Sequence, residues 1–257
     1  MKIAILNRPS RALEKCELTF MDRNTIHFDV ALKQHADYAT VIRDVGVQVE
    51  MLEVTQAAPD SVFVEDTAII LDELAIVTSM GSASRRVEIE AMSEVVAGFR
   101  ETVKRISSPA NIEGGDVLRV GKTLFVGESS RTNAAGISAL DKFVRPYGYR
   151  VCPVKVRGCL HLKTGITALD DETFIYNSQW IDASPFAEAK LIDVAVDEPF
   201  GANVLRIDDQ LILNAAYPRT ADKIEALKFK TKRVNISEFG KAEAGLTCMS
   251  LVFEQAI

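Results

Sequence analysis

The chain carries a repeated pattern that is clearest in Thr123-Leu124-Phe125-Val126-Gly127-Glu128-Ser129-Ser130-Arg131-Thr132-Asn133. The apolar and β-branched run at its start predicts a short strand, and the small polar residues after it predict a turn. Residues 133–144 then have the apolar spacing of a helix, and residues 150–156 are again rich in strand-forming side chains. The stretch therefore predicts a strand, a turn with an arginine, a helix and a second strand.

The same order of elements recurs along the chain. Further strand-like runs occupy residues 74–78, 173–176 and 211–214, and arginine-containing turns occur at Ser84-Arg85-Arg86 and Pro218-Arg219-Thr220. A further unit is predicted at the N-terminus, from a strand at residues 3–6, a helix at 31–45 and a strand at 48–52. These units amount to about five βαβ-type modules with no linker between them, so we expect one domain spanning residues 1–257.

Two architectures suit alternating strands and helices. A doubly wound sheet is the usual outcome, but no G-x-G-x-x-G motif follows any strand, so a dinucleotide-binding fold is not indicated. The alternative is closure of the similar modules around a central axis. Closure would bring the module turns, with their arginines and acids, to one shared central site, and we favour it.

Composition narrows the class of protein. The 257 residues are 47% apolar and 26% charged, as in soluble globular proteins, and the net charge of −6 argues weakly against nucleic acid as a partner. No run of 18 apolar residues occurs, which predicts no membrane span, and residues 3–6 are too short for a signal peptide. The four cysteines match no disulfide framework or zinc finger. We therefore expect reduced thiols in a cytoplasmic protein.

A nucleophile and a proton carrier are available, far apart in sequence. Cys248 lies in a small polar turn before an apolar terminal run, where a lone cysteine is more often a packed core residue. His161 precedes Lys163-Thr164-Gly165, and a histidine held in such a turn either titrates near neutral pH or is structural. His27 and His35 are expected on the surface. Too few additional ligands accompany Cys159-x-His161 to indicate zinc.

Carboxylates and arginines supply the other candidate site residues. In an extended segment, Asp60 and Asp66 would point to one face and Glu65 to the other. Arg85 and Arg131 occupy equivalent turns, where each would bind a carboxylate or phosphate, pair internally with an acid, or lie on the surface. Glu113 and Asp116 flank Gly114-Gly115, and either one could orient a histidine.

Six segments together resemble the dimethylarginine dimethylaminohydrolases, which belong to the guanidine-modifying superfamily of arginine deiminases and amidinotransferases. They cover nearly the whole chain in the order found in that family. The segments are residues 59–66, 84–86, 112–116, 126–133, 161–165 and 247–250. The resemblance implies an α/β fold of the pentein type, a five-module pseudosymmetric propeller of ββαβ repeats around a central pocket.

The resemblance also implies roles for individual residues. Cys248 matches the nucleophile, His161 the general acid and base, and Glu113 the carboxylate that orients it. The matching substrate-binding positions are Leu18 in a mobile lid, Asp60, Glu65 and Asp66 for the cation, Arg85 and Arg131 for the α-carboxylate, and Ala242 through its backbone. The chain departs from the family at Ala242-Glu243-Ala244-Gly245, where Ile/Val-Asp-Gly-Gly is usual, and in the lid after Thr19.

The implied activity is hydrolysis of methylated arginine, a small-molecule substrate, to citrulline and dimethylamine or methylamine. The bond broken is a linear amidine C–N bond. The implied reaction proceeds through a covalent thiouronium intermediate and needs no metal or organic cofactor. An arginine deiminase or another guanidine hydrolase is the alternative within the superfamily, although deiminases usually carry larger inserts. A non-catalytic protein that binds cationic amino acids is the alternative outside it. A homodimer is compatible with the resemblance.

Overall fold

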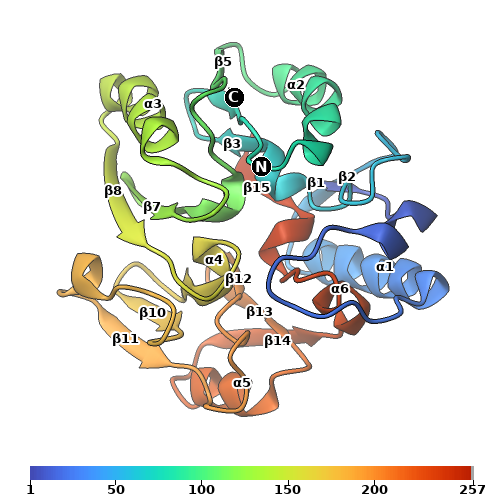
Figure 1. The fold of residues 1–257 in the computed structure, drawn as a ribbon. Coiled ribbons are helices and arrows are strands. Elements are labelled where there is room, and N and C mark those ends of the chain that lie inside the picture. The colour runs from blue at the N-terminus through green and yellow to red at the C-terminus, as the bar shows by residue number, and fades with distance from the viewer. Residues whose placement is uncertain (256–257) are drawn as a thin grey trace.

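The computed structural model describes residues 1–255 and consists of five three-stranded sheets around a common axis (Figure 1). The middle strand of each sheet pairs antiparallel with the first strand and parallel with the third. Four sheets follow the chain in order: β3 (Ala68–Ile70), β4 (Ala75–Val77), β5 (Val103–Arg105); β6 (Val117–Val120), β7 (Thr123–Glu128), β8 (Arg150–Lys155); β9 (Ile166–Ala168), β10 (Thr173–Tyr176), β11 (Lys190–Asp193); β12 (Leu205–Ile207), β13 (Gln210–Asn214), β14 (Lys230–Val234). The expected strands at 74–78, 123–127, 173–176 and 211–214 are confirmed as the middle strands β4, β7, β10 and β13.

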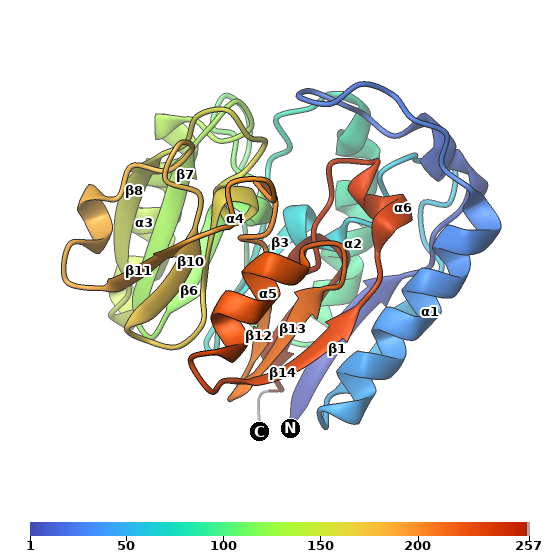
Figure 2. The ribbon, with the colours of Figure 1, turned by 90° about the horizontal axis from the view of Figure 1, so that it is seen from below.

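The fifth sheet joins the two ends of the chain. Its order is β15 (Leu251–Glu254), β1 (Lys2–Asn7) and β2 (Gln48–Leu52), with Ile3 opposite Phe253. Figure 2 shows the N-terminal end, where β1 begins, at the lower edge of the molecule as drawn. Backbone hydrogen bonds between β1 and β15 thus close the ring. Because β15 faces the axis, the residues just before it also lie near the axis.

Helices cover the outside of the ring (Figure 1). Four of the five sheets have an α-helix between the middle and third strands: α1 (Phe28–Asp44), α2 (Ile89–Ala97), α3 (Ala134–Val144) and α5 (Pro218–Glu225). Between β10 and β11 the described chain has only the short 3₁₀ helix η6 (Ser184–Phe186). The single-turn helices α4 (Leu162–Gly165) and α6 (Ser237–Gly240) lie between modules. No helix in residues 1–255 is long and apolar enough to cross a membrane.

One expectation for α1 is wrong. His35 is buried, with 2% of its surface exposed, because it lies on the same helical face as Ala31 and Tyr38 and packs near Phe239. Burial lowers the pKa of His35 to about 4, so the side chain is neutral. His27, which ends the segment before α1, is exposed as expected.

The core consists of five apolar clusters, and each one joins two neighbouring sheets. Alternate residues of a middle strand enter different clusters. In β7, Leu124 and Val126 pack toward the β3–β4 sheet, whereas Phe125 packs toward the β9–β10 sheet. Since each sheet buries both faces against other sheets, we infer that the chain folds as a single domain.

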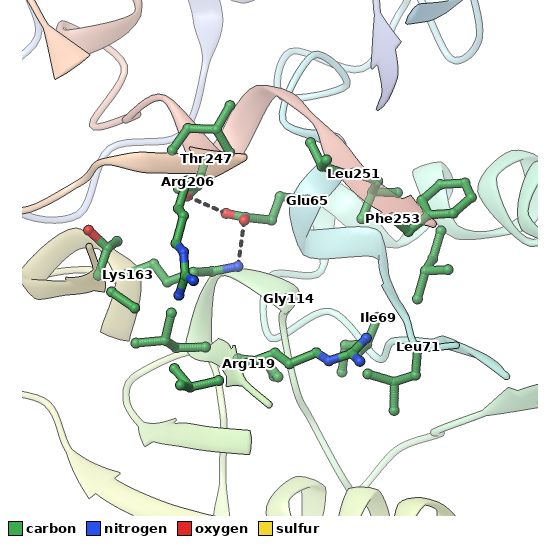
Figure 3. Close-up of a pocket in the computed structure, with 18 of the residues that line it drawn as sticks. Glu65, Ile69, Leu71, Gly114, Arg119, Lys163, Arg206, Thr247, Leu251 and Phe253 are labelled. Atoms are coloured by element: carbon green, nitrogen blue, oxygen red, sulfur yellow. Dashed lines mark hydrogen bonds and ion pairs between the residues drawn. The ribbon is translucent and has the colours of Figure 1, made fainter. Parts of the chain in front are cut away.

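The first strand of every sheet faces the axis. Residues of β3, β6, β9, β12 and β15 together line a central cavity of about 550 Å³, whose mouth carries Arg119 and Arg206 (Figure 3). Both arginines are paired across neighbouring modules, Arg119 with Asp72 and Arg206 with Asp171. The segments that precede these first strands therefore meet at one end of the central cavity.

The start of α3 offers a test of how neighbouring modules are joined. Asn133 caps the helix by accepting a hydrogen bond from the Gly136 N–H at 2.8 Å, and it also contacts the backbones of Asn111 and Pro109. We expect Asn133→Ala to lower the free energy of unfolding by about 1–3 kcal/mol, because the helix cap and the hydrogen bonds with the backbones of Asn111 and Pro109 are lost together. Denaturant unfolding measures this. Asn24→Ala, at an exposed loop position, should change stability by less than about 0.5 kcal/mol, and an equal loss in both variants would contradict the assignment.

Candidate active site

His161 and Glu113 form a buried pair near the axis. The Glu113 Oε2 lies 2.7 Å from the His161 Nε2, and Glu113 is fully buried. The other carboxylate oxygen, Oε1, accepts a hydrogen bond from the Gly81 N–H at 2.9 Å. Asp116, the other candidate for this role, instead accepts from the Leu162 N–H at 2.8 Å and from the Ser129 hydroxyl. Glu113 therefore contacts the ring, and Asp116 holds the backbone beside it.

The surroundings of His161 keep it protonated. Burial alone would lower its pKa, but the nearby carboxylates of Asp66, Glu113 and Asp116 outweigh burial and raise the pKa to about 9. Asp66 responds in the opposite direction. Burial opposes its charge, yet the charges of His161 and Arg85 outweigh that effect and lower the pKa of Asp66. The ring is thus a cation at neutral pH that can donate a proton.

Cys248 faces the same cavity as this pair. It lies in the 3₁₀ helix η7 (Thr247–Met249), and its Sγ accepts a hydrogen bond from the Gly245 N–H at 3.3 Å. Burial, followed by the charges of Glu65 and Asp66, raises the pKa of the thiol to about 12. The thiol is therefore neutral at physiological pH in this structure.

The two arginines have different surroundings. Arg85 is buried and donates to Asp66, to Glu88 and to the carbonyls of Phe63 and Asp60, so four of its five N–H groups have partners. The Arg131 guanidinium contacts Glu17 and Thr19, each at 3.4 Å, and lies 3.8 Å from the Glu113 Oε1. Arg131 is the more available of the two for a ligand's carboxylate. The internal pairing considered for Arg85 is present with Asp66.

The acidic segment around Asp66 is not extended as expected, although Asp60 and Asp66 do face one cavity while Glu65 faces another. Residues 60–63 form a turn, in which the Phe63 N–H donates to the Asp60 carbonyl, and η2 (Val64–Thr67) is a 3₁₀ helix. The turn and the helix together direct Asp60 and Asp66 toward the cavity that contains Cys248. The pKa of Asp60 is raised to about 6, chiefly by burial.

Glu65 points the other way, to the base of the central cavity (Figure 3). Its carboxylate pairs with Lys163 and accepts from the Thr247 hydroxyl at 2.8 Å. Since Thr247 directly precedes Cys248, Glu65 holds the turn that carries the thiol. The larger central cavity has no histidine or cysteine in its lining, so the chemistry is concentrated in the smaller one.

Most of the expected site residues share that smaller cavity. Its lining includes Cys248, His161, Glu113, Asp60, Asp66, Arg85, Arg131 and Ala242. Leu18 is not among the lining residues and packs against the apolar cluster around Phe239, while Glu65 lies behind Thr247. Sequence reasoning did not assign Glu17 or Glu243, which also line the cavity. The only signal for them was their position in the lid and in the segment that departs from the family pattern.

Three of these side chains could be considered as metal ligands. Ligand atoms of Asp66, Glu113 and His161 lie within 4.8 Å of one another. A metal-binding histidine must be neutral, whereas the pKa of His161 is about 9 and its Nε2 already bonds Glu113. The donor set therefore fits a shared proton better than a divalent ion.

The His161–Glu113 pair predicts a measurable titration. We expect Glu113→Gln to move the pKa of His161 from about 9 toward the ordinary value of 6.5, because a buried negative charge is removed. In the unmodified protein, the stability due to the raised pKa is complete below pH 6.5 and is lost as the pH rises through about 9. NMR titration of the ring measures the shift. Glu128→Gln, an exposed glutamate, is the control, and an unchanged titration in Glu113→Gln would contradict the pairing.

Comparisons with known proteins agree with this geometry. A family model described as N,N dimethylarginine dimethylhydrolase, eukaryotic, matches residues 7–182. The chain is 33% identical over 253 residues to the N(G),N(G)-dimethylarginine dimethylaminohydrolase of Pseudomonas aeruginosa, covering 98% of this chain and 99% of the relative. It is 35% identical over 251 residues to the Streptomyces coelicolor enzyme of the same name, and the match covers 97% of this chain and 96% of the relative.

Solved structures give the same result for the fold. A mutant of the Pseudomonas aeruginosa enzyme complexed with citrulline superposes with a TM-score of 0.94 at 32% identity, over 98% of both chains. The N-terminal domain of a cyanobacterial arginine dihydrolase shares the fold with a TM-score of 0.88 at 18% identity. The expected five-module α/β propeller is thereby confirmed, and this chain belongs to the dimethylarginine dimethylaminohydrolase family.

Proposed function

We propose that this protein is a cysteine hydrolase of methylated arginines that releases citrulline and dimethylamine or methylamine. The observation that carries the proposal is the buried His161–Glu113 pair at 2.7 Å, which shares one cavity with the Cys248 thiol and Arg131. Family membership supports the reaction class, and the acids of the cavity support a cationic substrate.

The substrate's two ends have complementary partners in the cavity. Arg131 binds the α-carboxylate, since a guanidinium donates two parallel hydrogen bonds to a carboxylate. Asp60 binds the α-ammonium. Asp66 binds the guanidinium, with its own charge maintained by His161 and Arg85. In this arrangement Arg85 supports Asp66 rather than the substrate, and Glu65 supports the Cys248 turn rather than the guanidinium.

The first half of the reaction forms a carbon–sulfur bond. The bound guanidinium lowers the pKa of Cys248, and the thiol proton leaves to solvent. The thiolate attacks the central guanidinium carbon. Protonated His161 then gives its proton to the methylated nitrogen, and the carbon–nitrogen bond breaks to release dimethylamine. A cationic thiouronium remains on Cys248, and Glu113 steadies the neutral histidine.

The second half uses the same histidine as a base. Neutral His161 takes a proton from water, whose oxygen attacks the thiouronium carbon. The new hydroxyl group then loses its proton to solvent as the carbon–sulfur bond breaks. Citrulline departs, His161 is again protonated, and the thiolate recovers its proton from solvent. Every proton transfer is thus made by residues of this cavity or by solvent.

Removal of the nucleophile is the direct test. We expect Cys248→Ser to release citrulline from asymmetric dimethylarginine at least about 1,000-fold more slowly than the wild type, because the serine hydroxyl is far less ionised than a thiol. Its far-UV circular dichroism should be unchanged. Cys152→Ser, at a half-buried cysteine on β8, should retain activity. Full activity of Cys248→Ser would refute the proposed nucleophile.

Free arginine should be assayed beside the methylated substrate. Cysteine-dependent release of citrulline from dimethylarginine alone supports the proposal, whereas turnover of arginine alone would indicate a deiminase. Binding of either compound without citrulline formation would indicate a non-catalytic binding protein.

The two roles of His161 can be separated by truncation. We expect His161→Gly to accumulate a covalent adduct with S-methyl-L-thiocitrulline, since a thiol leaving group needs little protonation whereas water attack still needs a base. Intact-protein mass spectrometry should detect the adduct on Cys248. The wild type should turn the compound over without accumulation, and equally fast adduct hydrolysis in both proteins would contradict the assigned base.

A further inference from the structure

In this structure the lid, residues 17–22, is closed over the active-site cavity, to whose lining it contributes Glu17. The space enclosed by Cys248, His161, Arg131 and the lid has a volume of about 30 Å³. Sites for small-molecule ligands usually measure roughly 300–1,000 Å³, so an amino acid cannot fit here without movement of the lid. The contacts that hold the lid shut therefore influence which ligands bind.

Glu17 makes the central contacts of the closed lid. Its main-chain N–H donates to both oxygens of Asp60, at 3.3 and 3.2 Å. Its carboxylate pairs with the Arg131 guanidinium at 3.4 Å and accepts from the Ser84 hydroxyl. Glu17 thus places its backbone nitrogen on Asp60, the proposed partner of the α-ammonium, and its carboxylate on Arg131, the proposed partner of the α-carboxylate. These are the two groups at the α-end of an amino acid.

Arg131 has few other partners in the described chain. Thr19, also in the lid, lies 3.4 Å from its guanidinium, and Glu113 lies 3.8 Å away. Arg85 cannot substitute for it, because four of its N–H groups are already bonded. An incoming α-carboxylate must therefore compete with Glu17 for Arg131.

Glu17 is charged in this setting. Burial opposes ionisation, but the hydroxyls of Ser82 and Ser84 and the charge of Arg131 outweigh it and hold the pKa of Glu17 below its usual range. Its side chain is 34% exposed, so the contact is screened by solvent and can be broken.

Glu243 fastens the other end of the lid. Its carboxylate accepts hydrogen bonds from the N–H groups of Thr19, Phe20 and Met21. The backbone of Glu243 has φ +58°, a conformation that L-residues seldom adopt and that aims this side chain at the lid. The lid is held by backbone bonds to Glu243, which leaves the Glu17 carboxylate in place over Arg131.

Resting on the function proposed above, we propose that Glu17 is a specificity-determining residue, an internal substitute for the α-end of the substrate. Its carboxylate competes with the α-carboxylate of methylarginine for Arg131. A guanidine without an α-carboxylate also needs the lid to move, but it offers Arg131 no carboxylate, so the Glu17–Arg131 pair can form again once that ligand is bound. Glu17 therefore weakens the binding of guanidines that carry an α-carboxylate, but not the binding of simple alkylguanidines. The difference in affinity between the two classes is smaller as a result.

Two ligands that differ only at the α-end test this competition. Calorimetry on the Cys248→Ser protein measures the dissociation constants of asymmetric dimethylarginine and of N,N-dimethylagmatine, which lacks the carboxylate. Adding Glu17→Gln should tighten binding of dimethylarginine by about two- to fivefold, as expected when one partly exposed ion pair no longer competes. Binding of dimethylagmatine should change less than about twofold.

Glu14→Gln is the matched control. Glu14 is an exposed glutamate three residues before Glu17, and it does not line the cavity. This variant should leave both dissociation constants unchanged. An equal gain for both ligands in Glu17→Gln would mean that the substitution merely opens the lid, and no gain for dimethylarginine would mean that Glu17 does not compete. Either result overturns the proposal.

A second measurement separates this proposal from the proposed function. Alkylation of Cys248 by iodoacetate and by iodoacetamide, followed by peptide mass spectrometry, needs no substrate and no turnover. Iodoacetate carries a carboxylate that Arg131 can attract, so Glu17→Gln should raise the ratio of the iodoacetate rate to the iodoacetamide rate by about two- to fivefold. An unchanged ratio overturns the competition even if the protein hydrolyses dimethylarginine. A raised ratio supports it even if dimethylarginine is not the substrate.

Discussion

The middle strand of each sheet is apolar on both faces because each face packs against a different neighbouring module. Phe125 of β7 enters one cluster while Leu124 and Val126 enter another, and Ile175 and Phe174 of β10 are divided in the same way. No module could bury these residues alone, so the sheets are stable only as a closed set. The pairing of β15 with β1 completes that set, which makes the final strand part of the first module.

Ring closure also explains why the reactive groups meet. Asp66, Glu113, His161 and Cys248 each occupy the segment just before the first strand of a sheet, and the first strands line the axis. Residues that are distant along the chain therefore converge at one end of the central cavity. A desolvated site results, in which burial makes every unpaired charge costly and the pKa values of neighbours depend strongly on each other.

This mutual dependence divides the charged residues into two groups. Arg85, Glu88, Glu65 and Lys163 satisfy one another or the backbone and hold the site's walls. Arg131 and Asp60 are instead in contact with the lid, through Glu17. The first four residues are paired within the walls of the site and are therefore held in place. The side chains of Arg131 and Asp60 have their closest polar contacts with the lid, so a ligand that displaces Glu17 can reach them. The lid is thus electrostatically a part of the site, as well as its cover.

Local patterns were sufficient to predict the middle strands, the helices α1 and α3, and the motifs around Cys248, His161 and Glu113, because apolar periodicity and turn residues act over short distances. The short first strands β6, β9 and β12 have little local signature, since their burial comes from the axis rather than from their own sequence. Tertiary packing alone buried His35 and selected Glu113 over Asp116 as the partner of His161. It also placed Glu17 on Arg131. Each of these outcomes depends on which residues, far apart in the sequence, become neighbours in a desolvated space. Local sequence patterns carry no information about such neighbours.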